Sequence, residues 1–284
     1  MNNTTPPPHL LGKIREKGFN FLLNRQEFPS FLLLFTDYDG TLAPFQDDPT
    51  QAYPLPEAGR LLLDLNALPN ILVMVITGRE PEDIRKFLAS KEISVAGLHG
   101  LVYLDSGSDK IEFLGENNLS LPSGVKGRIR EVAREHSGVN LENKGGLLAL
   151  HWSPESQFSP DGVREEMEEM LAGAGWEVLQ GRQVLEVRPA GWHKGKAVDY
   201  LRSRLAASYF SQEMISTQAE IPAIYLGDDT TDEDVFKNFT EPGFTVYIKN
   251  QDELETAADY YLKDPLEVRK FLEQLLQEAQ KKLC

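Results

Sequence analysis

Two aspartates one residue apart follow a short apolar run near the start of the chain. Residues 31–36 read Phe-Leu-Leu-Leu-Phe-Thr, and Asp37, Asp39, Gly40 and Thr41 lie within the next five positions. Such a run fits a strand buried on both faces, and open α/β sheets bind ligands at the carboxyl ends of their strands. Two carboxylates held together there repel each other and need a cation. The stretch therefore predicts a Mg²⁺ site at which one carboxylate can act as a nucleophile.

The five residues from Asp37 to Thr41 resemble the DxDGT signature of haloacid dehalogenase (HAD) superfamily phosphatases. The resemblance implies that Asp37 attacks phosphorus and forms an aspartyl-phosphate, while Asp39 protonates the leaving oxygen and later deprotonates water. It also implies that Asp37 and the main-chain carbonyl of Asp39 bind Mg²⁺. We expect Gly40 and Thr41 to contact the substrate. The alternative is a strand-end turn in which an aspartate caps the next helix.

A second apolar run, residues 70–76, ends in Thr77, Gly78 and Arg79. In HAD phosphatases a serine or threonine at the corresponding place donates a hydrogen bond to the phosphate, so the resemblance gives this catalytic role to Thr77. Gly78 and Arg79 are expected to contact the substrate. A lone threonine at a strand end is otherwise most often a cap.

A lysine motif follows much later in the chain. Lys194 stands before a glycine at a predicted helix start, as in the third HAD motif, and would neutralise the charges of Asp37 and of the phosphate. Lys196 is the competing candidate, but the order Lys-Gly-x-Ala favours Lys194. The alternative is a solvated surface lysine.

Residues 227–234, Gly-Asp-Asp-Thr-Thr-Asp-Glu-Asp, resemble the fourth HAD motif. Acidic residues past a strand supply the oxygen ligands that Mg²⁺ prefers. We expect Asp228 to bind the metal directly, and Asp229 and Asp232 to bind it directly, through water or from behind the other ligands. An acidic surface loop is the alternative, and the occurrence of four motifs in the family's order at predicted strand or helix ends argues against it.

The elements that must position these motifs alternate between strand and helix, which predicts an α/β fold with a doubly wound parallel sheet, Rossmann-like and of the HAD type. The expected core strands are 31–37, 70–76, 93–97, 222–226 and 244–248, with a hairpin over 101–114. The expected core helices are 57–68, one from Pro81, 195–207 and 265–282. Residues 9–28 are expected to form an outlying helix, in which Gly18 is a weak point.

The pattern changes after about residue 116. The order helix, strand, strand occurs twice, which predicts a small sheet with helices on one face. Its place between the second and third motifs resembles the α/β cap of one HAD subclass. The expected cap elements are 124–136, 139–143, 146–152, 160–173, 176–180 and 183–188, with Met167, Met170 and Leu171 pointing inward. The expected domains are an N-terminal extension (1–28), a core in two parts (29–116 and 189–284) and a smaller α/β cap domain (117–188).

Several segments narrow the resemblance to trehalose-6-phosphate phosphatases. They are 227–234, Leu98-His99-Gly100, Glu142-Asn143-Lys144-Gly145 with Leu150-His151-Trp152, and Leu185-Glu186-Val187-Arg188-Pro189. The resemblance implies that the cap residues Glu142, Lys144 and Glu186 bind sugar hydroxyls, and we expect His99 to contact the substrate. A surface ion pair is the alternative for the cap residues.

The predicted function is therefore Mg²⁺-dependent hydrolysis of trehalose 6-phosphate, which would couple the chain functionally to a trehalose-6-phosphate synthase. Other glycosyl phosphates, such as sucrose 6-phosphate or glucosylglycerol phosphate, are alternative substrates. A phosphomutase and a non-catalytic module that regulates a trehalose-6-phosphate synthase are further alternatives. A module of the last kind should have lost its catalytic aspartates, and Asp37, Asp39 and Asp228 are all present.

Composition limits the partners. The 284 residues carry a net charge of −15, which argues against nucleic acid but not against a small sugar phosphate. The one cysteine, Cys284, rules out an intrachain disulfide and fits a reducing compartment. The N-terminus lacks the pattern of a signal peptide, and no stretch approaches the roughly 20 apolar residues of a membrane span. We expect a cytoplasmic protein without a membrane partner.

Overall fold

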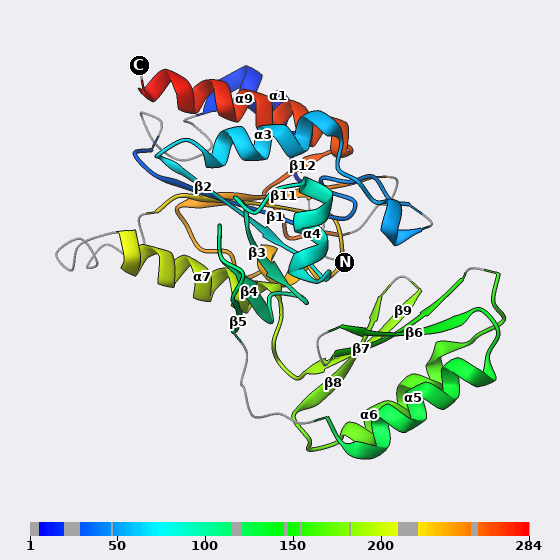
Figure 1. The fold of residues 1–284 in the computed structure, drawn as a ribbon. Coiled ribbons are helices and arrows are strands. Elements are labelled where there is room, and N and C mark those ends of the chain that lie inside the picture. The colour runs from blue at the N-terminus through cyan, green and yellow to red at the C-terminus, as the bar shows by residue number, and fades with distance from the viewer. Residues whose placement is uncertain are drawn as a thin grey trace. The chain divides into compact units, whose positions relative to one another are not determined.

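The chain folds into two compact units in the computed structural model. Residues 1–112 and 193–284 form the first, here called the core unit, and residues 113–192 form the second, the insert unit (Figure 1). The structure describes residues 6–19, 29–46, 48–114, 121–144, 147–153, 155–181, 183–209, 221–250 and 255–283. No helix among these residues is long and apolar enough to cross a membrane.

The larger sheet has eight strands in the order β12-β11-β10-β1-β2-β3-β4-β5. The six strands from β12 to β3 are parallel, and β4 runs antiparallel to β3. The strands are β1 (Leu32–Thr36), β2 (Ile71–Ile76), β3 (Ser94–Gly97), β4 (Val102–Leu104), β5 (Ile111–Phe113), β10 (Ala223–Gly227), β11 (Gly243–Ile248) and β12 (Tyr260–Leu262).

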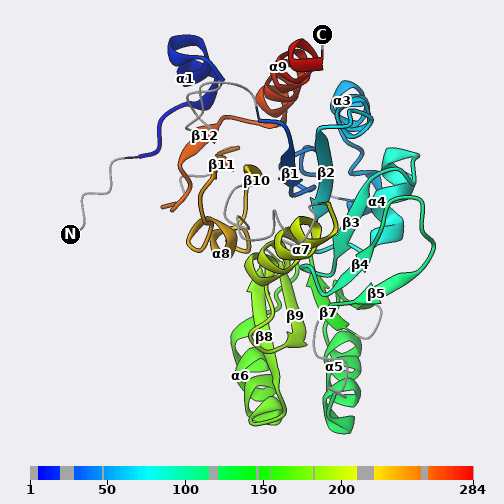
Figure 2. The same ribbon diagram turned by 90° about the vertical axis from the view of Figure 1, so that its left-hand side faces the viewer.

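Helices cover both faces of this sheet. Figures 1 and 2 show α1, α3 and α9 on one face and α7 on the other. All five residues of β1 are buried, as the apolar run requires when both faces of a strand are covered. The helices are α1 (Leu10–Lys17), α3 (Pro56–Asn66), α4 (Pro81–Leu88), α7 (Lys194–Tyr209), α8 (Glu233–Phe236) and α9 (Pro265–Leu283), and a 3₁₀ turn spans Pro49–Gln51. The doubly wound α/β prediction is confirmed.

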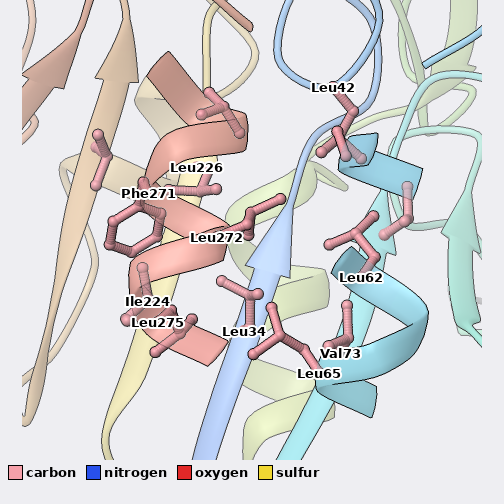
Figure 3. Packing of buried hydrophobic residues seen from close by; sticks show 14 of the residues in the cluster. Leu34, Leu42, Leu62, Leu65, Val73, Ile224, Leu226, Phe271, Leu272 and Leu275 are labelled. Atoms are coloured by element: carbon pink, nitrogen blue, oxygen red, sulfur yellow. The ribbon is translucent and has the colours of Figure 1, made fainter. Parts of the chain in front are cut away.

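The main hydrophobic core lies between the sheet and the face that carries α3 and α9. Inward side chains from β1, β2 and β10 meet leucines of α3 and apolar residues of α9 (Figure 3). The labelled members are Leu34, Leu42, Leu62, Leu65, Val73, Ile224, Leu226, Phe271, Leu272 and Leu275. Every one of them is at most 1% exposed, so their burial fixes the register of the strands that carry the polar motifs.

The order in which strands are added to the sheet reverses between the parallel neighbours β1 and β10. From β1 the chain continues to β2 and β3 on one side, while β10, β11 and β12 build the other side. Thr36 pairs with Leu226, and the amide nitrogen of Asp37 donates to the carbonyl of Leu226 at 2.8 Å. The two strands therefore end side by side, at the kind of switch point where open α/β sheets bind ligands.

The insert unit repeats helix, strand, strand twice, as the sequence predicts. Its four antiparallel strands have the order β6-β7-β9-β8, and its helices contact β6, β7 and β8. The elements are α5 (Ser123–Glu135), β6 (Val139–Lys144), β7 (Leu147–Trp152), α6 (Pro160–Leu171), β8 (Trp176–Gly181) and β9 (Val184–Pro189).

Some local predictions were wrong. Met170 is 37% exposed, whereas Met167 and Leu171 on the same helix are buried as expected. The N-terminal helix ends at Lys17, where Gly18 takes a positive φ of 80°, and it is not an outlier. Leu10 is fully buried, and the ring of Phe19 stacks on Phe271 of α9. The rest of the expected helix (residues 20–28) and the expected turn at 145–146 lie outside the described residues.

Two short elements escaped prediction. Strand β12 has only three residues, and α8 is a single turn inside the acidic motif. Neither is long enough to establish a period of 2.0 or 3.6 residues in the sequence. Strand β12 nevertheless belongs to the large sheet, because it pairs in parallel with β11 and forms one edge of the sheet.

Candidate active site

Three carboxylates meet where β1 and β10 end. Asp37 directly follows β1, Asp228 directly follows β10, and Asp232 immediately precedes α8. One ligand oxygen from each lies within 4.8 Å of the other two. We call these three residues the acidic cluster. Asp37 and Asp232 are almost wholly buried and Asp228 is half-buried, so their mutual repulsion is poorly screened by solvent.

Lys194, the first residue of α7, places its ammonium group beside the acidic cluster. Its Nζ donates to Oδ1 of Asp37 and to Oδ1 of Asp232, both at 2.8 Å, and its side chain is only 3% exposed. Burial alone would lower the pKa of Lys194, but the charges of Asp232 and Asp37 outweigh it and raise the pKa. The lysine is thus held as a cation beside Asp37. Lys196, the competing candidate, lies exposed.

Asp232 organises this part of the site. Its Oδ1 accepts from Lys194 and from the hydroxyl of Tyr225, and its Oδ2 accepts from the amide nitrogens of Asp228 and Asp229, both at 3.0 Å. A carboxylate has about four lone-pair positions, so these four hydrogen bonds use its capacity. Asp232 therefore fixes Lys194 and the loop, and Asp37 and Asp228 are the members of the cluster that could hold a metal ion.

Burial changes the pKa values of the other two carboxylates of the cluster, Asp37 and Asp228. Burial raises the pKa of Asp37 to about 7, with a further contribution from the charge of Asp232, while Lys194 acts in the opposite direction. Burial and the charge of Asp37 likewise raise the pKa of Asp228 well above its ordinary value. The acidic cluster carries three negative charges when ionised, against one positive charge on Lys194. Hard oxygen ligands with excess negative charge fit Mg²⁺.

The glycine and threonine of the first motif lie against Asp228. Gly40 has a φ of 72°, and a Cβ at that position would run into the carboxylate of Asp228. The fully buried Thr41 donates from Oγ1 to Oδ1 of Asp228 at 3.3 Å. Both residues thus hold the carboxylate of Asp228 in place, and their expected contact with substrate stays a prediction.

Two further residues of the site were not foreseen. Asn250 donates from Nδ2 to the carbonyl of Gly40 at 3.0 Å and to Oδ2 of Asp228 at 3.3 Å. Its place just past the buried strand β11, at the same sheet edge as the motifs, is a signal that could have revealed it. Tyr225 lies inside β10, where an aromatic residue is typical of a core strand, so the sequence carried no such signal.

The second motif lies beside Asp39. Thr77 is buried, and its hydroxyl oxygen accepts from the amide of Arg79 at 3.1 Å, which leaves the hydroxyl proton for another acceptor. Arg79 donates from Nε and Nη2 to the two carboxylate oxygens of Asp39, both at 2.7 Å. The sequence predicted Arg79 as a substrate contact, and its pairing with Asp39 was not foreseen. The side chain of Asp39 is 36% exposed, in contrast to the buried Asp37.

Two predicted residues stand at the margin of the site. The ring of His99 packs over Gly78, where an added Cβ would come within 2.9 Å of Cε1. Asp229 is exposed, and its Oδ1 accepts from the hydroxyl of Thr230 at 3.0 Å and from the Thr230 amide. This local turn occupies one oxygen of Asp229, and the expected role of Asp229 at a metal site stays a prediction.

The three predicted sugar-binding residues lie on strands of the insert unit. Glu142 pairs with Ala149, which pairs in turn with Glu186, so both glutamates share one row and one face of the sheet. We call this pair the acidic row. The buried Leu150 and Leu185 point to the other face, since side chains alternate along a strand. Oε2 of Glu142 lies 2.8 Å from Nε2 of His151. Lys144 holds a register position on the face of Glu142, and its side chain lies outside the described residues.

The chain is similar to several known proteins in sequence and in fold. The trehalose-phosphatase sequence profile matches residues 35–265. Trehalose-phosphate phosphatase B of Arabidopsis thaliana is 30% identical over 265 residues, which cover 88% of this chain and 67% of that protein. The C. albicans trehalose-6-phosphate phosphatase C-terminal domain superposes with a TM-score of 0.76 at 25% identity, covering 96% of this chain and 99% of that chain. A haloacid dehalogenase-like hydrolase from Bacteroides thetaiotaomicron, at 16% identity, shares the fold with a TM-score of 0.63 and covers 86% of this chain and 99% of its own. The family profile spans both halves of the acidic site and most of the chain, and the chain therefore belongs to the trehalose-phosphatase family.

Proposed function

We propose that this chain hydrolyses trehalose 6-phosphate to trehalose and phosphate through an aspartyl-phosphate intermediate. The observation that carries the proposal is the buried Lys194 held between Asp37 and Asp232, beside Asp228, at the switch point of a trehalose-phosphatase fold. Phosphoryl transfer needs a nucleophile, neutralisation of charge and positioning, and these residues supply all three.

In the first step, a carboxylate oxygen of Asp37 attacks phosphorus and the bond from phosphorus to the sugar oxygen breaks. Asp39 gives a proton to that leaving oxygen, so trehalose departs neutral. In the second step, Asp39 takes a proton from water, the water oxygen attacks phosphorus, and the bond to Asp37 breaks. Thr77 and Lys194 hydrogen-bond the phosphate, and Lys194 also balances the charge of the nucleophile.

The oxygen ligands fit Mg²⁺, and we assign it to Asp37, Asp228 and the main-chain carbonyl of Asp39, with Asp232 and Asp229 behind them. When bound, Mg²⁺ supplies positive charge that offsets the repulsion among the carboxylates and the phosphate. The raised pKa values of Asp37 and Asp228 support this assignment, since a divalent cation relieves the cost of their ionisation.

The insert unit is proposed as the cap that selects the substrate, with Glu142, Lys144 and Glu186 binding sugar hydroxyls. The register that brings the two glutamates into one row supports this role, because a disaccharide presents many hydroxyls to charged acceptors. The expected coupling to a trehalose-6-phosphate synthase stays a prediction.

The test is release of inorganic phosphate from trehalose 6-phosphate, with MgCl₂ and with a chelator. We expect turnover that the chelator abolishes and that MgCl₂ in excess restores. A parallel panel contains sucrose 6-phosphate and glucosylglycerol phosphate. Equal values of kcat/KM across the panel would contradict trehalose 6-phosphate as the specific substrate and favour a broader glycosyl phosphatase. Turnover that persists with chelator would contradict the metal assignment.

A further inference from the structure

We propose that Arg79 is a positioning residue that aims the carboxylate of Asp39 for proton transfer, so that Arg79 acts in the reaction through Asp39. The inference rests on the proposed function, because it takes the acid/base role of Asp39 from there. It concerns a residue that the sequence indicated only as a substrate contact.

The first observation is the shape of the contact between the two side chains. Arg79 donates from Nε to Oδ2 and from Nη2 to Oδ1 of Asp39, each at 2.7 Å. Two parallel hydrogen bonds fix both the distance and the plane of a carboxylate, which a single bond does not. Each oxygen spends one lone pair on the arginine and keeps another for a proton of water or of the leaving group.

The second observation is that the guanidinium of Arg79 is itself supported by aromatic rings. Its central carbon lies 5.1 Å from the ring centre of Phe87 and 5.8 Å from that of Tyr38. The two rings stack with centroids 5.7 Å apart, and the buried Tyr38 donates from its hydroxyl to the carbonyl of Ala52 at 2.8 Å. Cation–π contact with fixed rings restrains the guanidinium and therefore the carboxylate that it holds.

The third observation concerns the main chain that carries Arg79. The amide of Leu98 donates to the carbonyl of Arg79 at 3.0 Å, and the amide of His99 donates to the carbonyl of Thr77 at 2.8 Å. Leu98 and His99 have positive φ values of 53° and 57°. Left-handed conformations are costly for non-glycine residues and gather at functional sites. The strained turn after β3 thus clamps the loop 77–79 from which Arg79 extends.

These contacts form one chain of support, from the turn after β3 through loop 77–79 to Arg79 and then to Asp39. Asp39 needs such support because its side chain is far more exposed than the buried Asp37 and Asp232. Asp37 has Lys194 to fix its position. The geometry gives Arg79 the corresponding task for Asp39.

The decisive measurement is the dependence of turnover on the leaving group in the variant Arg79→Met. A poor leaving group, such as a sugar alkoxide, needs the proton of Asp39, whereas 4-nitrophenolate leaves without it. We expect kcat for trehalose 6-phosphate to fall about 100-fold, as for a misplaced catalytic group, with KM changed by less than about threefold. In a series of substituted phenyl phosphates, the rate constant of phosphoryl transfer to Asp37 should fall least for 4-nitrophenyl phosphate. A plot of the logarithm of this rate constant against leaving-group pKa should therefore be steeper for the variant than for the native chain.

A double-mutant cycle tests whether Arg79 acts through Asp39. If it does, Arg79→Met adds no further loss in an Asp39→Asn background, whereas independent roles would multiply. Arg79→Lys, which offers one point charge in place of the fork, should restore part of the lost rate. Multiplicative losses, or equal losses for every leaving group with a raised KM, would overturn the inference in favour of direct phosphate binding. A higher kcat in Arg79→Met would overturn it too, since Arg79 would then hold Asp39 away from the position that proton transfer needs.

The matched control is Arg60→Met, which removes an exposed arginine of α3 that pairs with Asp64 and should leave all rates unchanged. Thermal melts of each variant separate unfolding from catalysis. The phenyl phosphate series also separates the two proposals. If the native chain hydrolyses phenyl phosphates but not trehalose 6-phosphate, the proposed substrate is wrong while the slope still tests Arg79. If it hydrolyses no phosphate ester with MgCl₂, both proposals fall.

Discussion

The acidic cluster of the core unit and the acidic row of the insert unit hold their charges in opposite ways. In the cluster, Asp232 is fully buried and every position on its carboxylate accepts a hydrogen bond. In the row, Glu142 is 50% exposed and pairs with His151, which is itself 38% exposed. Buried charges are fixed by folding and are costly to disturb, whereas exposed pairs contribute little to stability. The fixed charges of the acidic cluster suit the precise positioning of reacting groups, and the exposed charges of the acidic row suit the replacement of water by a ligand.

The largest effect is expected for Asp37→Asn, which removes the nucleophile but keeps its shape. We expect kcat for trehalose 6-phosphate to fall on the order of 10⁵-fold, with a melting temperature no lower than that of the native chain, because a buried carboxylate is replaced by a neutral amide. Phosphate release and thermal melts check this. Asp64→Asn, at an exposed position of α3, is the matched control. Undiminished turnover in Asp37→Asn would refute the nucleophile assignment.

The next effect concerns stability within the acidic loop. Asp232→Ala should lower the free energy of unfolding by about 3–5 kcal/mol, because Lys194 and two main-chain amides lose a buried acceptor. Asp229→Ala, at an exposed position three residues earlier, should cost less than about 1 kcal/mol. Urea unfolding at one pH measures both variants. Similar losses of unfolding free energy in the two variants would contradict the idea that burial makes Asp232 more important for stability than Asp229.

A smaller effect is the pH dependence of the metal-free protein. The pKa of Asp37 is raised from 3.8 to about 7, so between these values the unfolded chain releases a proton that the folded chain keeps. The free energy of unfolding of the metal-free protein should therefore fall as the pH rises through this window, by up to about 1.4 kcal/mol per pH unit for this one group. Above about pH 7 this loss is complete.

MgCl₂ should offset the loss by binding the ionised carboxylates, so it should raise the melting temperature more at pH 8 than at pH 5. Melts with chelator and with MgCl₂ at the two pH values test this. An equal shift at both would contradict the link between the raised pKa of Asp37 and the metal.

The smallest effect is expected in the acidic row. Glu142→Gln should raise KM for trehalose 6-phosphate about tenfold, the equivalent of one charged hydrogen bond, without changing turnover of 4-nitrophenyl phosphate. The free energy of unfolding should change by less than about 0.5 kcal/mol. Glu166→Gln, on a helix of the same unit, is the control that should leave both substrates unaffected. An unchanged KM for Glu142→Gln would remove this residue from sugar binding.

The main elements were predictable from sequence because their signals are local. Apolar runs such as 31–36 and 70–76 require cover on both faces, and that requirement already implies helices on either side of the sheet. The carboxyl ends of those runs then bring Asp37, Thr77 and Asp228 to one edge. The burial of Met170 was predicted wrongly because the buried face of α6 is narrow and consists of Val163, Met167 and Leu171. Met170 lies beside this face, so it is apolar without being buried.

The division of labour among identical side chains was not predictable. Asp228, Asp229 and Asp232 differ only in position within one loop, and what separates them is which amides and hydroxyls point at each. The pairing of Arg79 with Asp39 joins residues 40 apart in sequence and depends on side-chain direction, which no local pattern encodes. The same is true of Lys194 against Lys196, where burial makes the choice.

The adjacency of β1 and β10 has a consequence for how the protein is made. Asp37 and Lys194 are separated by 157 residues, and β10 comes later still. At a ribosomal pace of about 5–20 residues per second, Asp37 waits roughly 8–30 s for Lys194 alone. Until residues 194–232 have been made, Asp37 has neither the lysine nor the two aspartates that surround it in the folded chain, whereas Asp39 already has Arg79. The acidic cluster is thus completed only after both parts of the core unit have been made, so a shorter chain that lacks Lys194, Asp228 and Asp232 cannot form it.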